Sequence, residues 1–171
     1  TIHGVADLAE KICLNRRVPG WLYQVDRGAT SIWERWDALG EDGTIYDPDM
    51  NSYNHYAYGA VCQWLFEGVA GVAPVADAPG FDQVTLNPLI LPALNPVQAW
   101  HDCRHGRIDA AWALNGSRVT YRVTLPQGST GRLTASAQRS NVTVDAKPVT
   151  VPAGGLTIPA GSHEITFDLT T

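Results

Sequence analysis

Cysteine is scarce in this sequence of 171 residues, which contains only Cys13, Cys62 and Cys103. An odd number of cysteines at such wide spacing is not a disulfide framework, and none of the three belongs to a CxxC pair. His101 and His105 flank Cys103, but the alternation of residue types there favours a strand with ordinary side chains over a zinc site. The sequence therefore predicts no metal site.

Positive charge and long apolar runs are also lacking. Twelve Lys and Arg stand against 17 Asp and Glu, for a net charge of −5, and the basic residues are scattered, which argues against a nucleic-acid partner. No apolar run approaches the ~18 residues of a membrane span, and no signal peptide opens the chain, so we expect no membrane association. These features predict a soluble protein and leave an extracellular or a cytoplasmic location equally open.

The beginning of the chain is unusual, because Thr1 takes the place of an initiator methionine and leads directly into a helical pattern. We therefore expect a processed product or a piece of a longer polypeptide. With 44% hydrophobic residues, the chain can nevertheless bury a substantial core.

Two amphipathic helices are predicted in the first 71 residues. Apolar residues recur at helical spacing in two places: Val5, Leu8, Ala9 and Ile12, and then Tyr58, Val61, Cys62, Leu65 and Val69. Ser52 or Asn54 is the expected N-cap of the second helix, which Gly71 and Pro74 should end. About 40 residues between the helices show little helical pattern but are rich in Trp and Tyr. We expect them to form an ordered, functional loop.

From about residue 80 the apolar period changes from 3.6 to 2. Alternating runs at 108–114 and 119–125 flank Asn115 and Gly116, which is a strong hairpin signal. Seven further short strands are expected near residues 82–86, 97–103, 131–137, 141–144, 149–151, 155–158 and 163–169. This succession predicts an antiparallel β-sandwich, and therefore an α+β chain.

The two parts differ in their ability to form a core. Eight or nine strands can close a sandwich, whereas two helices and a loop leave their apolar stripes in need of other helices. Residues 73–80, with two prolines, are expected to link the parts. We therefore expect one domain at 1–73, completed by absent polypeptide, a partner chain or the sandwich, and a second domain at 74–171.

Glu34 is the most informative residue, because it lies between Trp33 and Trp36 and next to Arg35. Burial and a neighbouring cation tune a carboxyl group for acid–base chemistry, and aromatic rings grip sugars through their C–H faces. A surface Glu–Arg pair beside two core tryptophans explains these eight residues equally well.

Two motifs give the chain a family resemblance. Residues 28–37 read Gly-Ala-Thr-Ser-Ile-Trp-Glu-Arg-Trp-Asp, and residues 47–59 read Asp-Pro-Asp-Met-Asn-Ser-Tyr-Asn-His-Tyr-Ala-Tyr-Gly. In this order and separation they closely resemble the catalytic-domain end of α-L-rhamnosidases of glycoside hydrolase family 78. The resemblance covers essentially the whole chain and is strongest over residues 20–72.

The resemblance implies an (α/α)6-barrel catalytic domain, here represented by two helices and a loop, followed by a β-sandwich. Members of the family are inverting glycosidases that release terminal α-L-rhamnose. No cofactor is implied for this chain. By this resemblance Glu34 is the general base, His55 contacts the sugar, and Trp33 and Trp36 line the subsite. As the less favoured alternative, His55 makes a capping or core hydrogen bond at a helix N-terminus, and the tryptophans could equally serve packing.

One element of the family pattern is missing. The general acid of such enzymes lies upstream in an acid-rich motif that has no counterpart here. We therefore expect the chain to supply half of a carboxylate pair for hydrolysis of a rhamnoside substrate and to be inactive alone. Two other interpretations remain open: a non-catalytic carbohydrate-binding module, and a structural fragment that associates through its helix faces.

Overall fold

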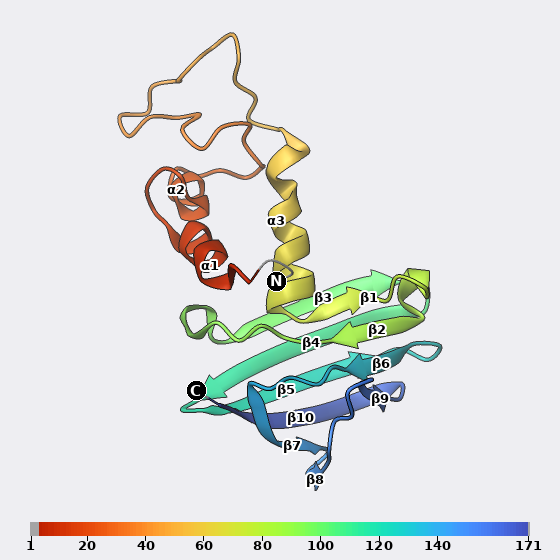
Figure 1. Cartoon of the computed structure of the whole chain (residues 1–171). Coiled ribbons are helices and arrows are strands. Elements are labelled where there is room, and N and C mark those ends of the chain that lie inside the picture. Colours follow the sequence, from red (N-terminus) through yellow and green to blue (C-terminus); the bar gives the residue numbers. More distant parts are fainter. Residues whose placement is uncertain (1–3, 171) are drawn as a thin grey trace. The chain divides into compact units, whose positions relative to one another are not determined.

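The computed structural model describes residues 4–170, and the chain divides into two compact units, the first ending at Gln63 and the second beginning at Trp64. The first unit contains the helices α1 (Ala6–Leu14), α2 (Trp21–Asp26) and α3 (Ala60–Gln63), together with the 3₁₀ turn η1 (Tyr56–Gly59). In Figure 1, α1 and α2 lie next to each other. No helix within residues 4–170 is long and apolar enough to cross a bilayer.

The helix α1 confirms the first predicted helix, and α2 corrects the expectation of a continuous loop after it. With six residues, α2 is too short to produce a recognisable 3.6-residue period. The second predicted helix exists, but it begins at η1, where Nδ1 of His55 accepts a hydrogen bond from the amide of Ala57 at 3.4 Å. The cap is therefore His55, and the prediction of Ser52 or Asn54 was wrong.

The second unit begins with η2 (Trp64–Val69), a π-helical segment that ends before Gly71. Gly71 has φ +73°, and a Cβ there would lie 2.2 Å from the backbone nitrogen of Pro88. Only glycine combines this left-handed conformation with such a close approach, so Gly71 ends the helix as predicted. Pro74 plays no part in the helix end, because it is the last residue of strand β1.

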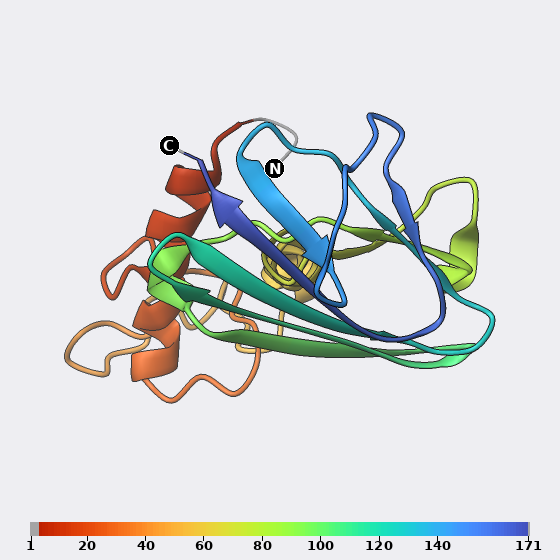
Figure 2. The same cartoon turned by 90° about the horizontal axis from the view of Figure 1, so that it is seen from below.

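Ten strands form two sheets in the described part of the chain (Figure 1). The four-stranded sheet has the order β1 (Val72–Pro74), β2 (Gln83–Leu86), β6 (Thr130–Leu133), β9 (Leu156–Ile158). The six-stranded sheet has the order β3 (Val97–Cys103), β4 (Gly106–Asn115), β5 (Arg118–Leu125), β10 (Gly161–Leu169), β7 (Arg139–Val144), β8 (Lys147–Pro148). Figure 2 shows β7 in light blue alongside β10 in violet, running in the opposite direction. The predicted α+β class with a β-sandwich is confirmed.

Several details differ from the sequence prediction. All strand pairs are antiparallel except β2 and β6, which pair in parallel. The hairpin between β4 and β5 is confirmed, but Asn115 pairs with Arg118, so the turn consists of Gly116 and Ser117. Residues 73–80 are not a plain linker, because they include the end of β1, a bridge between Val75 and Ala78, and part of the 3₁₀ turn η3 (Pro79–Phe81). A second 3₁₀ turn, η4 (Pro92–Leu94), precedes β3.

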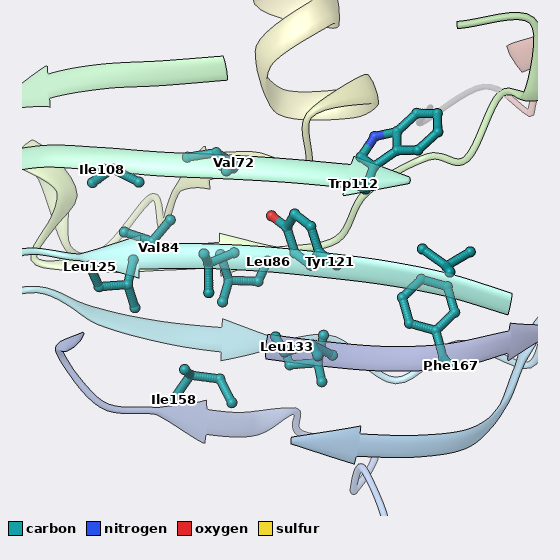
Figure 3. Close-up of a cluster of buried hydrophobic side chains, with 14 of the residues drawn as sticks. Val72, Val84, Leu86, Ile108, Trp112, Tyr121, Leu125, Leu133, Ile158 and Phe167 are labelled. Carbon is teal, nitrogen blue, oxygen red and sulfur yellow. The ribbon is translucent and has the colours of Figure 1, made fainter. Parts of the chain in front are cut away.

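The core of the second unit lies between the two sheets (Figure 3). Both sheets contribute fully buried side chains to it, among them Val84, Leu86, Leu133, Ile158, Ile108, Trp112, Tyr121, Leu125 and Phe167. The indole Nε1 of Trp112 donates to the carbonyl of Val69 at 2.8 Å, and the hydroxyl of Tyr121 donates to the carbonyl of Ala70 at 3.1 Å. These bonds attach the end of η2 to the six-stranded sheet and satisfy polar groups that the core would otherwise isolate.

Candidate active site

Glu34 lies in the irregular segment between α2 and η1 and is half-buried. Its carboxylate Oε2 accepts a hydrogen bond from the amide of Ser52 at 2.9 Å, and its own amide donates to the Ser52 carbonyl at 2.8 Å. Two bonds to one residue fix both the backbone and the side chain of Glu34. The carboxylate is therefore held in a defined position.

The same pairing brings His55 to the neighbouring segment. The amide of His55 donates to the carbonyl of Ile32 at 2.7 Å, and the hydroxyl of Ser31 donates to the carbonyl of Tyr53. Residues 31–34 and 52–55 therefore run beside each other, joined by backbone bonds at two places. This arrangement unites the two sequence motifs, although 21 positions separate the predicted base from the predicted sugar contact.

The hydrogen bond from the Ala57 amide determines which ring nitrogen of a neutral His55 carries the proton. Since Nδ1 accepts this bond, the neutral ring carries its proton on Nε2. The imidazole also lies parallel to the ring of Tyr56, at 5.9 Å between centroids and 6° between planes. Nε2 is consequently a donor with a fixed direction, as a contact to a sugar hydroxyl requires.

The two tryptophans that flank Glu34 in sequence belong to different clusters. Trp33 is 4% exposed and packs edge-on against Tyr53 at 5.5 Å. Trp36 is half-buried, stacks on Tyr58 at 5.3 Å, and meets Trp21 edge-on at 4.9 Å. Trp36 therefore belongs to a partly exposed aromatic surface, whereas the buried Trp33 supports the chain next to Glu34.

Arg35 is directed away from its neighbour Glu34. Its Nε lies 3.3 Å from Oδ1 of Asp37, and its guanidinium carbon lies 3.9 Å from the centre of the Tyr46 ring. Within residues 4–170 no ion pair joins Arg35 to Glu34. Arg35 therefore pairs with Asp37 and not with Glu34.

The loop is also tied down from its far side. Nδ2 of Asn51 and the hydroxyl of Tyr53 both donate to the carbonyl of Ala38, at 3.0 and 3.2 Å. The hydroxyl of Tyr23 on α2 donates to the carbonyl of Leu39 at 2.8 Å. Sequence reasoning missed the parts played by α2 and Ser52. Ser52 belongs to the second sequence motif, three positions before His55, so the motif already placed it near the candidate site.

The histidines and cysteine near residue 103 do not assemble a metal site. The ring of His101 packs on Phe81, with centroids 4.3 Å apart, and Nε2 of His105 lies 2.5 Å from Oδ1 of Asp82. Sγ of Cys103 contacts the carbonyl of Gly106 at 3.2 Å. In the part of the chain that the structure describes, no group of three or more His, Cys, Asp or Glu side chains could hold a metal ion.

Comparison with protein families divides the chain in two. Residues 1–69 match the bacterial alpha-L-rhamnosidase 6 hairpin glycosidase domain, and residues 71–153 match the bacterial alpha-L-rhamnosidase C-terminal domain. The predicted domain boundary between residues 73 and 74 stays a prediction.

Individual relatives show the same likeness. An alpha-L-rhamnosidase of Streptomyces avermitilis is 33% identical over 130 residues, and one of Formosa agariphila is 31% identical over 130 residues. These alignments cover 76% of this chain but only 12% and 14% of those proteins.

Solved structures agree with the sequence comparisons. The crystal structure of the Streptomyces avermitilis enzyme complexed with L-rhamnose has a TM-score of 0.79 at 31% identity and covers 95% of this chain and 16% of that one. The native enzyme of Aspergillus terreus has a TM-score of 0.72 at 26% identity, covering 90% of this chain and 16% of that one. The helical unit thus matches part of the six-hairpin glycosidase domain, and the sandwich matches the C-terminal domain. The chain belongs to the bacterial α-L-rhamnosidase family.

Proposed function

We propose that this chain forms the base-bearing part of an inverting glycosidase that releases terminal α-L-rhamnose from rhamnosides. The observation that carries the proposal is the fixation of the Glu34 carboxylate by the Ser52 amide, beside the segment that presents His55. A general base needs a carboxylate held in place next to the reacting water. Family membership supplies the substrate class.

Glu34 acts on the attacking water in this scheme. Ser52 holds Oε2, and Oε1 is the oxygen that we assign to the water. As the water oxygen bonds to the anomeric carbon, its proton passes to Glu34, and the bond to the aglycone oxygen breaks on the opposite face. An acid on that face protonates the leaving oxygen, and the two carboxyl groups of an inverting pair stand about 6.5–9.5 Å apart.

His55 and Trp36 are assigned to the sugar. Nε2 of His55 donates to a ring hydroxyl, because Nδ1 is already occupied by the Ala57 amide. Trp36 offers a partly exposed ring next to Glu34, so it is the better placed of the two tryptophans to cover the C–H face of the sugar. The subsite role of Trp33 stays a prediction, and its burial favours indirect support of Glu34.

The general acid is assigned to polypeptide outside this chain, as is the cover for the helices. The helix α1 has no buried residue, and Val5 and Leu8 are 50% and 55% exposed. Apolar side chains repeated along one helix face are usually covered by another helix. This chain spans 12–16% of its relatives, so we infer that the remaining barrel, or a partner chain, covers α1. The chain alone should therefore not hydrolyse rhamnosides.

The test compares hydrolysis of an aryl α-L-rhamnoside by this chain and by a longer form that supplies the rest of the barrel. In the longer form, Glu34→Gln should lower kcat by roughly 10²–10⁴-fold because proton transfer is lost. Glu41→Gln, a matched change at an exposed acid in the same loop, should leave kcat within about twofold, as expected away from the reacting atoms.

Azide distinguishes a base from a residue that merely shapes the site, because azide attacks without losing a proton. Glu34→Gly should recover turnover with sodium azide and give the rhamnosyl azide of inverted configuration. Activity of Glu34→Gln within a few-fold of wild type would overturn the assignment of Glu34. Release of rhamnose with retained configuration would overturn the inverting mechanism.

A further inference from the structure

A cavity of about 560 Å³ opens in the β-sandwich, far along the chain from Glu34. Its walls come mainly from two loops, residues 134–138 between β6 and β7 and residues 149–155 between β8 and β9, both seen at the top of Figure 2. Phe167 of β10 contributes an apolar wall. Cavities of about 300–1,000 Å³ are typical of sites for small molecules.

The wall of this cavity contains a guanidinium group. Arg139, the first residue of β7, donates through Nη2 to Oδ1 of Asn87 at 2.8 Å and to the carbonyl of Pro88 at 2.9 Å. Its guanidinium carbon lies 4.7 Å from the centre of the Phe167 ring. These contacts hold the side chain in one orientation and use neutral partners only.

Polar atoms remain unsatisfied at this place. Nη1 of Arg139 and Oγ1 of Thr134, both from residues that line the cavity, are buried and make no hydrogen bond within residues 4–170. Such atoms are uncommon in folded proteins because a buried polar group without a partner loses its hydration, and this penalty is greater for a charged group.

The charge of Arg139 also lacks compensation. Burial lowers its pKa, and within residues 4–170 its hydrogen bonds go to an amide oxygen and a backbone carbonyl, not to a carboxylate. A buried cation without a counter-ion destabilises a fold unless another function retains it. A carboxylate is the natural complement, since it is an anion and can accept a charge-assisted hydrogen bond from Nη1, the guanidinium nitrogen that Asn87 and Pro88 do not use.

We propose that this cavity binds a small hydroxylated carboxylate of about the size of one sugar ring, such as a sugar acid. The carboxylate pairs with Arg139, Ser136 and Thr150 bind the hydroxyl groups, and Phe167 covers the C–H face. Because Nη1 is closed to solvent, binding requires a small rearrangement of the cavity wall around Arg139. The site is independent of the proposed catalytic role of Glu34.

The residues that line the cavity favour a sugar acid over a neutral sugar and over inorganic phosphate. A neutral sugar would leave the guanidinium without a counter-ion. Inorganic phosphate would pair with Arg139 but would leave the apolar surface of Phe167 and Val151 uncovered. We therefore expect the affinity order glucuronate, then phosphate, then glucose.

The test is an amide NMR titration of the 171-residue chain with D-glucuronate, D-glucose and inorganic phosphate. Glucuronate should shift amides of both loops and bind at least about tenfold more tightly than glucose, because the ion pair is added. Arg139→Lys should weaken glucuronate binding at least about tenfold, since a compact ammonium cannot keep the bonds to Asn87 and Pro88 and also reach the ligand. The matched change Arg122→Lys, at an exposed ion pair with Glu164, should have no effect.

A blocking variant covers the case in which Arg139→Lys disturbs the fold. Ala153 is exposed at the cavity, so Ala153→Trp should fill the opening without touching the core, and glucuronate binding should be lost while the amide spectrum stays folded. No glucuronate binding by the wild-type chain would overturn the proposal. Equal binding of all three compounds, or unchanged binding by Ala153→Trp, would overturn it as well.

Discussion

Removing the hydroxyl of Tyr121 tests how the end of η2 is attached to the sandwich. Tyr121 is fully buried, and its hydroxyl donates to the carbonyl of Ala70 at 3.1 Å and contacts that of Gly71 at 3.3 Å. Tyr121→Phe keeps the ring and its packing, so any loss of stability comes from the hydroxyl alone. Burial raises the pKa of Tyr121, so the hydroxyl stays protonated and able to donate at neutral pH.

The expected loss of stability in Tyr121→Phe depends on whether each of the two carbonyls keeps a hydrogen-bond donor. The Gly71 carbonyl still accepts from the amide of Asn87 at 2.9 Å, so it remains satisfied after the change. The carbonyl of Ala70, a residue that is 1% exposed, loses the donor that Tyr121 supplies. One buried acceptor left unpaired costs about 1–2 kcal/mol. The apparent Tm should fall by roughly 3–6 °C for a protein of this size.

Urea denaturation followed by far-UV circular dichroism measures the effect on the sheets. The midpoint should fall while the slope m stays constant, because the surface exposed on unfolding is unchanged. Tyr56→Phe is the matched control, since Tyr56 is 91% exposed, and its free energy of unfolding should stay within about 0.5 kcal/mol of wild type. If Tyr121→Phe behaves like this control, the hydroxyl does not attach the segment and the reasoning is refuted.

Two further predictions concern pH and the sugar contact. The hydrogen bonds from His105 and from Arg104 lower the pKa of Asp82 in the folded state. The ionised carboxyl therefore stabilises the fold at a pH above its unfolded pKa of about 4. This contribution is lost as the pH falls through the lower pKa of the folded state. The stability advantage of wild type over Asp82→Asn, measured by urea midpoints, should therefore shrink from near pH 6 to near pH 3, and a constant difference would contradict it. In the longer enzyme, His55→Asn keeps a capping acceptor but removes the Nε2 donor, so kcat/KM should fall about 10–100-fold without loss of fold. Unchanged kinetics would remove His55 from the sugar site.

Sequence patterns predicted the sandwich well because its signals are local. The β4–β5 hairpin carries alternating side chains on both strands, and the apolar set of each strand could face only one core. The parallel pairing of β2 and β6 was not predictable in this way, because 43 positions separate their last and first residues and alternation carries no information on strand direction. Helix α2 escaped detection because one and a half turns show no clear period.

The sequence by itself determined the helical and sandwich parts, the family resemblance, and Glu34 and His55 as candidate site residues. The tertiary structure decided how these residues are held: Glu34 is fixed by Ser52, Arg35 pairs with Asp37, and the flanking tryptophans separate into a buried and a partly exposed cluster. The physical reason is that periodicity and motifs report on neighbours along the chain. Hydrogen bonds across 18 residues, and the position of the Arg139 guanidinium against the ring of Phe167, depend on contacts that form only when the chain is folded.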